Sequence, residues 1–285
     1  MLKFLKNWTL PLAMFAGAIG YFLLANVTIL EPAKPFVNWL IAVLTPFLIF
    51  AQLLLTFCKI EPKELLPKAW HVWLLSIQAV SSGIIALLLI FCPMEEAYRD
   101  IFEGAMVCLI CPTATAAAVI TGKLGGSAST LTTYTLLSNV LAAIAVPLVF
   151  PLVEPHADIT FVVAFLKILS KVFPLLLAPF FIALLFRYYI PSVHRLLSKY
   201  HGVAFYLWAV ALTIVTGQTV RSLVTAAADV SIEIMIALAG LATCCLQFYF
   251  GKRIGSAYHD RISAGQALGQ KNTAVSYTHL TLPTN

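Results

Sequence analysis

The sequence predicts an all-α, polytopic membrane protein. Of its 285 residues 61% are hydrophobic and only 11% are charged, with a mean hydropathy of +0.93, whereas about a quarter of the residues in soluble domains carry charge. The apolar residues form successive runs of the roughly 20 residues that a bilayer-spanning helix needs. These runs lack the alternation of membrane β-strands. A soluble fold is therefore excluded.

Eight apolar runs, separated by Pro, Gly and charged residues, predict transmembrane helices, and a ninth run begins near residue 260. The first run follows Lys3 and Lys6 without a small-residue cleavage site, so we expect a retained helix rather than a signal peptide. The predicted limits are 9–30, 35–58, 69–92, 101–122, 128–153, 159–190, 203–225 and 229–250.

The distribution of basic residues predicts a cytoplasmic N-terminus. With this orientation most Lys and Arg residues lie in cytoplasmic loops, as the positive-inside rule requires, and only Lys34, Arg99 and Arg221 lie in outer loops. We therefore expect a multi-pass protein of the cell inner (plasma) membrane, surrounded by the lipid bilayer. The net charge of +6 is divided among short clusters. A nucleic-acid partner would need basic residues gathered on one face, so none is expected.

The end of the chain differs from the rest. Residues 275–285 lack the apolar run that a helix begun at Arg261 needs to cross the bilayer. They also resemble a translated sequencing adapter, and we interpret them as a non-native tail. The natural protein is then expected to continue past Ala274, so that this chain lacks its last helix and part of the ninth.

Two of the runs are interrupted. In 101–122, Pro112 removes a backbone donor in mid-span and is followed by small and hydroxyl residues, among them Thr113 and Thr115. This pattern predicts an unwound helix centre, with a simple proline kink as the alternative. The ninth run carries polar residues at membrane depth: Gln266, Gln270, Lys271, Asn272 and Thr273.

These interrupted runs are the fourth and the ninth, five apart. Broken helices at matching positions of two halves indicate a secondary transporter built from inverted repeats, with the binding site where the breaks cross. We place the first five-helix repeat at 1–153 and the second, incomplete one at 154–274. The predicted substrate site is formed by Pro112, Thr113, Thr115, Asn272 and Thr273. Helix amino ends at this site, together with Lys271, would favour an anion.

Three motifs resemble the bile acid:sodium symporter family: CPTATAAAV at 111–119, TTYTLLSN at 132–139 and GQKNTA at 269–274. The likeness in span order covers essentially all of 1–274. It implies a ten-helix transporter with two inverted five-helix repeats, a core of helices 3–5 and 8–10, and a panel of helices 1, 2, 6 and 7. The resemblance also implies that the unwound helices 4 and 9 cross beside two sodium ions and a cavity for an organic anion.

The sequence departs from this family at the inferred sodium positions. Two positions that carry side-chain sodium ligands in the family are occupied here by Ala117 and Ala118. The position of the family's acid that bridges both ions is occupied by Ala267, and the position of a glutamine that coordinates the second ion is occupied by Lys271. Hard cations need several oxygen ligands, so we expect sodium not to bind as it does in the family. The family's helix-5 hydroxyl and helix-3 glutamine are matched by Thr135 and Gln78.

Lys271 allows two functional interpretations and a structural one. Its amine substitutes for the coupling cation, or it exchanges a proton during transport because burial disfavours the charged form. The structural alternative is that the amine extends to the membrane surface or pairs with an outer carboxylate.

Together these features predict a secondary active transporter of a small organic anion resembling a bile acid, steroid or keto acid. It would work by alternating access as a monomer or homodimer. The alternative is a receptor or sensor that binds a ligand in the same cavity without transporting it. An enzyme and a cofactor are not expected, because no nucleotide loop, metal cluster or Ser/His/Asp arrangement is present. We interpret Trp39, Trp70, Trp73 and Trp208 as membrane-interface residues.

Overall fold

The computed structural model describes residues 8–59, 63, 65–155, 159–200, 203–225 and 230–272. The elements in this part of the chain are α2 (Thr9–Asn26), the 3₁₀ helix η1 (Thr28–Ala33), α3 (Lys34–Lys59), α4 (Ala69–Phe91), α5 (Glu96–Ile110), α6 (Ala117–Lys123), α7 (Ala128–Val153), α8 (Phe161–Tyr189), α9 (Pro191–Lys199), α10 (Val203–Thr225), α11 (Val230–Ala257) and α12 (Arg261–Gly269). Among these residues one isolated antiparallel bridge joins Thr113 to Lys271.

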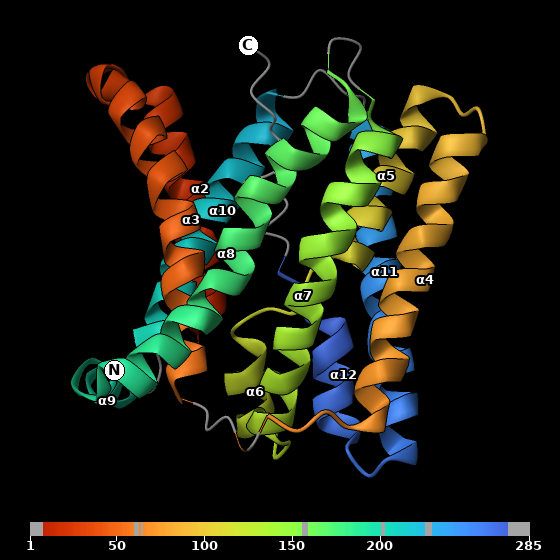
Figure 1. Ribbon diagram of the computed structural model, residues 1–285. Helices are drawn as coiled ribbons and strands as arrows, with labels where there is room; N and C mark the ends of the chain where they lie inside the picture. Colours follow the sequence, from red (N-terminus) through yellow and green to blue (C-terminus); the bar gives the residue numbers. More distant parts are fainter. Residues whose placement is uncertain are drawn as a thin grey trace.

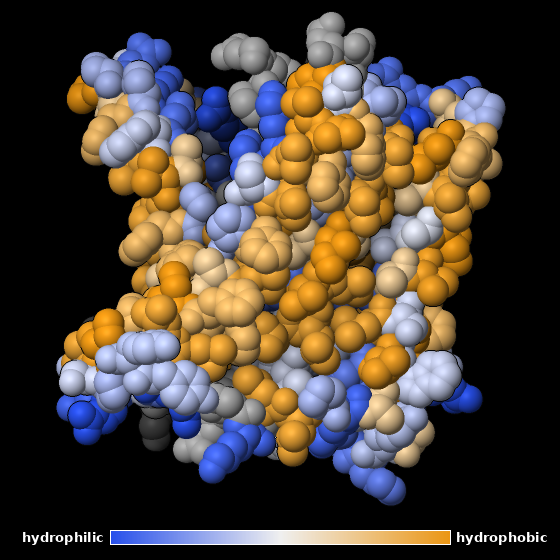
Figure 2. All heavy atoms as spheres, viewed as in Figure 1, coloured by the Kyte–Doolittle hydropathy of each residue, from blue (hydrophilic) through white to orange (hydrophobic). Residues whose placement is uncertain are grey.

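Seven spans in the described chain are long and apolar enough to cross a membrane: α2, η1 with α3, α4, α7, α8, α10 and α11. Their outer surfaces are hydrophobic; Phe15, Phe47 and Phe181 are 69, 60 and 58% exposed. Figure 2 shows hydrophobic residues across the middle of the visible face and hydrophilic residues at its two ends. So large an apolar belt requires contact with lipid. The prediction of an all-α, multi-pass membrane protein is therefore confirmed.

Several helices differ from their predicted limits: α2 ends at Asn26 rather than at 30, and α5 begins at Glu96 rather than at 101. α9 lies between the predicted spans 159–190 and 203–225 and carries Arg195 and Lys199. It forms because Pro191 suits the first helical position, and the Ser198 hydroxyl holds it by donating to the Cys58 carbonyl at 2.8 Å. α11 continues to Ala257, past its predicted end at 250, because packing against α12 continues beyond the apolar run.

The helices pack in two groups that meet along α7 and α8 (Figure 1). The α2 group contains α2, α3, α8 and α10, and the α4 group contains α4, α5, α6, α7, α11 and α12. Buried residues from α3, α4, α5, α7 and α8 fill the junction, including the almost inaccessible Leu53, Met106 and Leu176. The contact surface between the two groups is therefore apolar.

Glycines bring α11 and α12 into close contact. Gly251 and Gly255 on α11, like Gly265 and Gly269 on α12, are four residues apart. A Cβ atom at Gly251 would lie 2.6 Å from the Ala264 carbonyl oxygen, which is closer than Cβ contacts allow. Small residues at this spacing let helix backbones approach within membranes. The long α11 thereby holds the short α12 beside the centre of the α4 group.

Candidate functional site at the crossing of two interrupted segments

The fourth crossing is interrupted between α5 and α6. α5 ends at Ile110 and α6 begins at Ala117, and Cys111 has extended backbone with ψ 144°. Pro112 explains this break, because proline removes a helical hydrogen bond and disfavours helical backbone in the residue before it. The predicted unwinding is confirmed, and the interruption is larger than a proline kink.

The segment that follows α12 meets this interruption. α12 ends at Gly269, and Gln270 is extended. The Ala114 amide donates to the Gln270 carbonyl at 2.9 Å, and the Asn272 amide donates to the Pro112 carbonyl at 2.7 Å, on either side of the bridge between Thr113 and Lys271. Unpaired backbone groups are costly within a membrane. The two broken segments satisfy each other's backbone groups.

Two threonine side chains fix the crossing to its surroundings. The Thr113 hydroxyl donates to the Ala267 carbonyl in α12 at 2.7 Å, and the Thr113 amide donates to the Ser138 hydroxyl in α7 at 3.3 Å. The Thr115 hydroxyl donates to Oε1 of Gln52 in α3 at 2.9 Å. Because α3 belongs to the α2 group, the Thr115–Gln52 hydrogen bond links the crossing to the other half of the molecule.

Gln78, near the middle of α4, supplies hydrogen bonds to the carboxyl end of α5. Its buried amide nitrogen donates to the carbonyls of Ile110 and Cys111 at 3.0 and 3.2 Å, which have lost their helical partners. Its oxygen accepts from the hydroxyls of Tyr134 and Ser138 at 3.2 and 3.1 Å. One side chain thus ties the break to both α4 and α7.

Lys271 places a buried amine at this crossing. Its Nζ has no hydrogen-bond partner among the described residues, and the thiols of Cys108 and Cys111 are close enough to interact with its charge. Within the described chain Lys271 makes no ion pair with a carboxylate. The structural alternative, an amine at the membrane surface or paired with an outer carboxylate, is therefore not observed.

Helix ends of both kinds lie at the crossing. α5 and α12 end there, at Ile110 and Gly269, and α6 begins there, at Ala117. A helix amino end favours an anion and a helix carboxyl end favours a cation. The expected amino end is thus present, beside two carboxyl ends.

The three alanines at the inferred sodium positions lie in an apolar cluster. Ala117 and Ala267 are fully buried, and Ala118 is 9% exposed. The cluster also contains Trp70, Leu74, Leu131, Tyr134, Ala264 and Leu268. None of the three alanines supplies a side-chain oxygen. These positions therefore pack against hydrocarbon and aromatic rings, and the Ala267 carbonyl also accepts from the Thr113 hydroxyl.

Trp70 contradicts its predicted position at the membrane interface. It is fully buried, and its ring lies 4.0 Å from the His71 ring and 6.0 Å from the Tyr134 ring, between centroids. Trp39 and Trp73 are 59 and 57% exposed. Trp70 packs in the apolar cluster with Ala117, Ala118 and Ala264, a set of tertiary contacts that local hydropathy does not reveal.

The remaining predicted site residues do not all join the crossing through their side chains. The Thr135 hydroxyl donates to the Leu131 carbonyl within α7 at 3.0 Å, and Gln266 has a buried Oε1 without a partner among the described residues. Gln270 joins the crossing through its backbone. Thr273 lies outside the described residues. Gln247, which was not among the predicted residues, donates its amide to the Cys108 carbonyl at 3.3 Å. A lone amide in an apolar run is the sequence signal that points to it.

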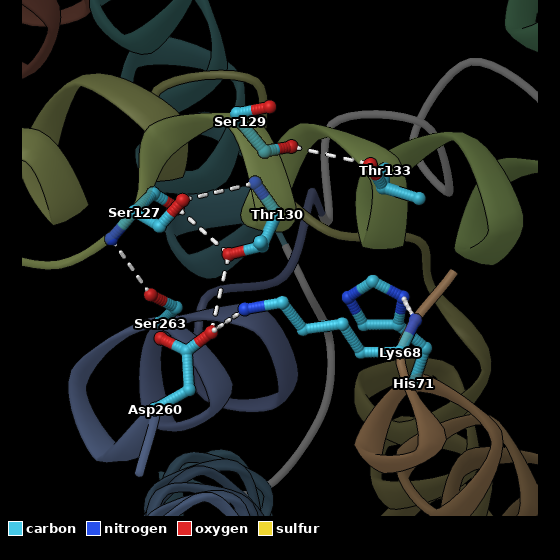
Figure 3. A network of polar contacts seen from close by, with 8 residues as sticks. All are labelled: Lys68, His71, Ser127, Ser129, Thr130, Thr133, Asp260 and Ser263. Atoms are coloured by element: carbon cyan, nitrogen blue, oxygen red, sulfur yellow. Dashed lines mark hydrogen bonds and ion pairs between the residues drawn. The ribbon is translucent and has the colours of Figure 1, made fainter. Parts of the chain in front are cut away.

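A polar network positions the amino end of α12 (Figure 3). The Asp260 carboxylate lies 3.0 Å from Nζ of Lys68, just before α4, and accepts from the Thr130 hydroxyl of α7 at 3.3 Å. The Ser127 amide donates to the Ser263 hydroxyl at 2.9 Å. These contacts join α12 to two neighbours at the end opposite the crossing, so both ends of this short helix are held.

No protein-family model and no curated protein matches the chain.

Proposed function

We propose that the protein is a secondary active transporter of a small organic anion, similar to the bile acid:sodium symporter family, in the cell inner (plasma) membrane. The observation that supports this proposal is the pairing of two interrupted segments at the bridge between Thr113 and Lys271. Broken helices that cross near the bilayer centre are typical of transporters with inverted repeats. The proposal includes repeats at 1–153 and 154–274 and a cytoplasmic N-terminus.

The two helix groups suggest how access could alternate. The α2 group would rock against the α4 group, exposing the crossing first to one side of the membrane and then to the other. The Thr115–Gln52 hydrogen bond runs between these groups, so it would break when they separate. The bonds from Gln78 lie within the α4 group and would persist. The crossing would then move as a unit.

Lys271 is the residue that we expect to hold the substrate. Its buried amine lacks a hydrogen-bond partner among the described residues, and a substrate carboxylate would supply one as a charge-assisted hydrogen bond. In this proposal the amine replaces a coupling sodium ion, consistent with the alanines at 117, 118 and 267. Transport is then independent of a sodium gradient.

Flux measurements in liposomes test this function. The protein is purified and reconstituted into liposomes. Uptake of a labelled bile acid, a steroid sulfate and a keto acid is measured with and without sodium, in parallel with equilibrium binding. We expect uptake of at least one anion without sodium, and at least a tenfold loss in Lys271→Met. Lys199→Met, which removes an exposed amine from α9, serves as the control.

The outcomes separate the alternatives. Uptake that rises steeply with sodium would contradict the replacement of the ion by Lys271. Binding without flux would contradict transport and favour the receptor or sensor. If none of the anions either binds or moves, the organic-anion proposal is wrong.

A further inference from the structure

A cavity of about 540 Å³ lies between α2, α3 and α10, within the α2 group and away from the crossing. Its size falls within the roughly 300–1,000 Å³ of small-molecule sites. α2 and α10 approach closely at Gly17 and Gly217. Gly20 also lines the cavity, and a Cβ atom there would meet nothing within 4 Å. The space beside Gly20 is therefore open.

Basic side chains gather at one end of this cavity. Lys34 and Asn38 are one turn apart on α3, and the Asn38 side-chain oxygen accepts from Nη1 of Arg221 at 3.0 Å. Lys34 lies 3.5 Å from the Glu31 carboxylate, with both side chains partly exposed, so this pair contributes little. No described carboxylate lies within ion-pair distance of Arg221. This end therefore carries excess positive charge.

The rest of the lining is mainly apolar. Leu24, Val37, Ile41 and Ile214 contribute side chains to it. The outer surfaces of α2 and α10 are also hydrophobic, with Phe22 and Val224 48 and 57% exposed. A molecule dissolved in the bilayer would therefore meet an apolar surface leading to the two basic residues.

We propose that this cavity binds an anionic amphiphile, with its acidic head group at Lys34 and Arg221 and its apolar body between α2 and α10. A guanidinium group matches the planar geometry of a carboxylate and also binds phosphate. The cavity is a separate site from that of the transported anion, because none of the lining residues belongs to the crossing. A phospholipid and a free fatty acid share this chemistry.

Ligand binding to the purified protein in an uncharged detergent tests the proposal. Dodecanoate is titrated while the melting temperature is recorded, and dodecanol serves as the uncharged match. We expect dodecanoate, but not dodecanol, to raise the melting temperature. In a second arm, native mass spectrometry compares protein from nanodiscs of phosphatidylglycerol with protein from phosphatidylcholine. Retained phosphatidylglycerol would identify a lipid, and dodecanoate binding alone would identify a free amphiphile.

Two variants locate the ligand. Arg221→Gln removes a charged hydrogen-bond donor, worth about 1.5–3 kcal/mol, so the affinity for the bound probe should fall about tenfold or more. Gly20→Leu fills the open space and should abolish binding. The controls are Arg253→Gln, an exposed cation on α11, and Gly83→Leu, where a Cβ atom also meets nothing within 4 Å. Each variant is first melted without ligand, so that a folding defect is distinguished from lost binding.

The proposal is wrong if dodecanol stabilises the protein as well as dodecanoate does, or if neither dodecanoate nor phosphatidylglycerol binds. Binding that both Arg221→Gln and Gly20→Leu leave unchanged would also overturn it. Failure here leaves the proposed transport function untouched, because flux depends on Lys271 rather than on this cavity.

Discussion

Buried polar side chains at the crossing bond chiefly to backbone groups that the interrupted helices leave open. Gln78 serves two carbonyls of the α5 end, and Thr113 serves the Ala267 carbonyl in α12. A buried group without a partner costs about 1–3 kcal/mol. Each of these side chains is therefore expected to affect stability more than its small size suggests.

Two buried threonines give a matched comparison. Thr113→Val removes a hydrogen bond between segments far apart in the chain, whereas Thr132→Val removes one within α7, from its hydroxyl to the Ala128 carbonyl. Both side chains are almost completely buried. We expect Thr113→Val to cost about 1–2 kcal/mol and Thr132→Val clearly less, measured by thermal unfolding in detergent. Equal losses would show that the hydroxyl of Thr113 does not stabilise the crossing.

At the scale of the element, α12 depends on its neighbours. It is a nine-residue helix, too short to be stable alone in water or to cross a bilayer. Glycines place it against α11, the Asp260 network holds its amino end, and the backbone bridge holds its carboxyl end. Its position is thus determined by packing rather than by helix propensity.

The glycine contact predicts a steric effect. In Gly251→Ala the new methyl group would meet the Ala264 carbonyl oxygen at 2.6 Å, so one backbone must move. We expect a cost of about 1–3 kcal/mol, seen as a lower melting temperature. Gly83→Ala in α4, where a Cβ atom has open space, should leave the melting temperature unchanged or raise it. A Gly251→Ala protein as stable as the parent would contradict the close packing of α11 and α12.

The network in Figure 3 predicts unequal roles for the two partners of one ion pair. Lys68 is 47% exposed and Asp260 11%, and only Asp260 also accepts from Thr130. Lys68→Ala should therefore cost less than about 1 kcal/mol, and Asp260→Ala about 1–2 kcal/mol. Unfolding of both single variants and the double variant measures this difference. A greater loss from Lys68→Ala would reverse the assignment.

For the whole molecule, the apolar belt and the two helix groups determine which thiols meet water. Cys92 is exposed at the carboxyl end of α4, and Cys245 is exposed in the middle of α11. With a cytoplasmic N-terminus, Cys92 faces the outside of the cell and Cys245 faces lipid. A membrane-impermeant maleimide should then label intact cells at Cys92, and Cys92→Ser should abolish this labelling. Labelling of Cys92 only after the cells are opened would place the N-terminus outside.

The amino-acid sequence is sufficient to predict the membrane character, the approximate limits of most spans and the break at Pro112. These features follow from local causes: hydropathy over about 20 residues, and a proline that lacks a backbone donor. The cluster of polar residues after Gly265 likewise indicated where the second interruption lies. α9 was not predicted, because it lies outside the apolar runs and its charged residues lower its hydropathy.

Which groups meet depends on the packing of helices that are far apart in the sequence. The Thr113 hydroxyl and the Ala267 carbonyl are 154 positions apart, and neither their pairing nor the bond between Thr115 and Gln52 follows from local pattern. The same holds for the burial of Trp70, the direction of the helix ends at Lys271 and the cavity at Arg221. Hydropathy specifies whether a residue lies in the membrane, but the contacts among helices specify what it touches there.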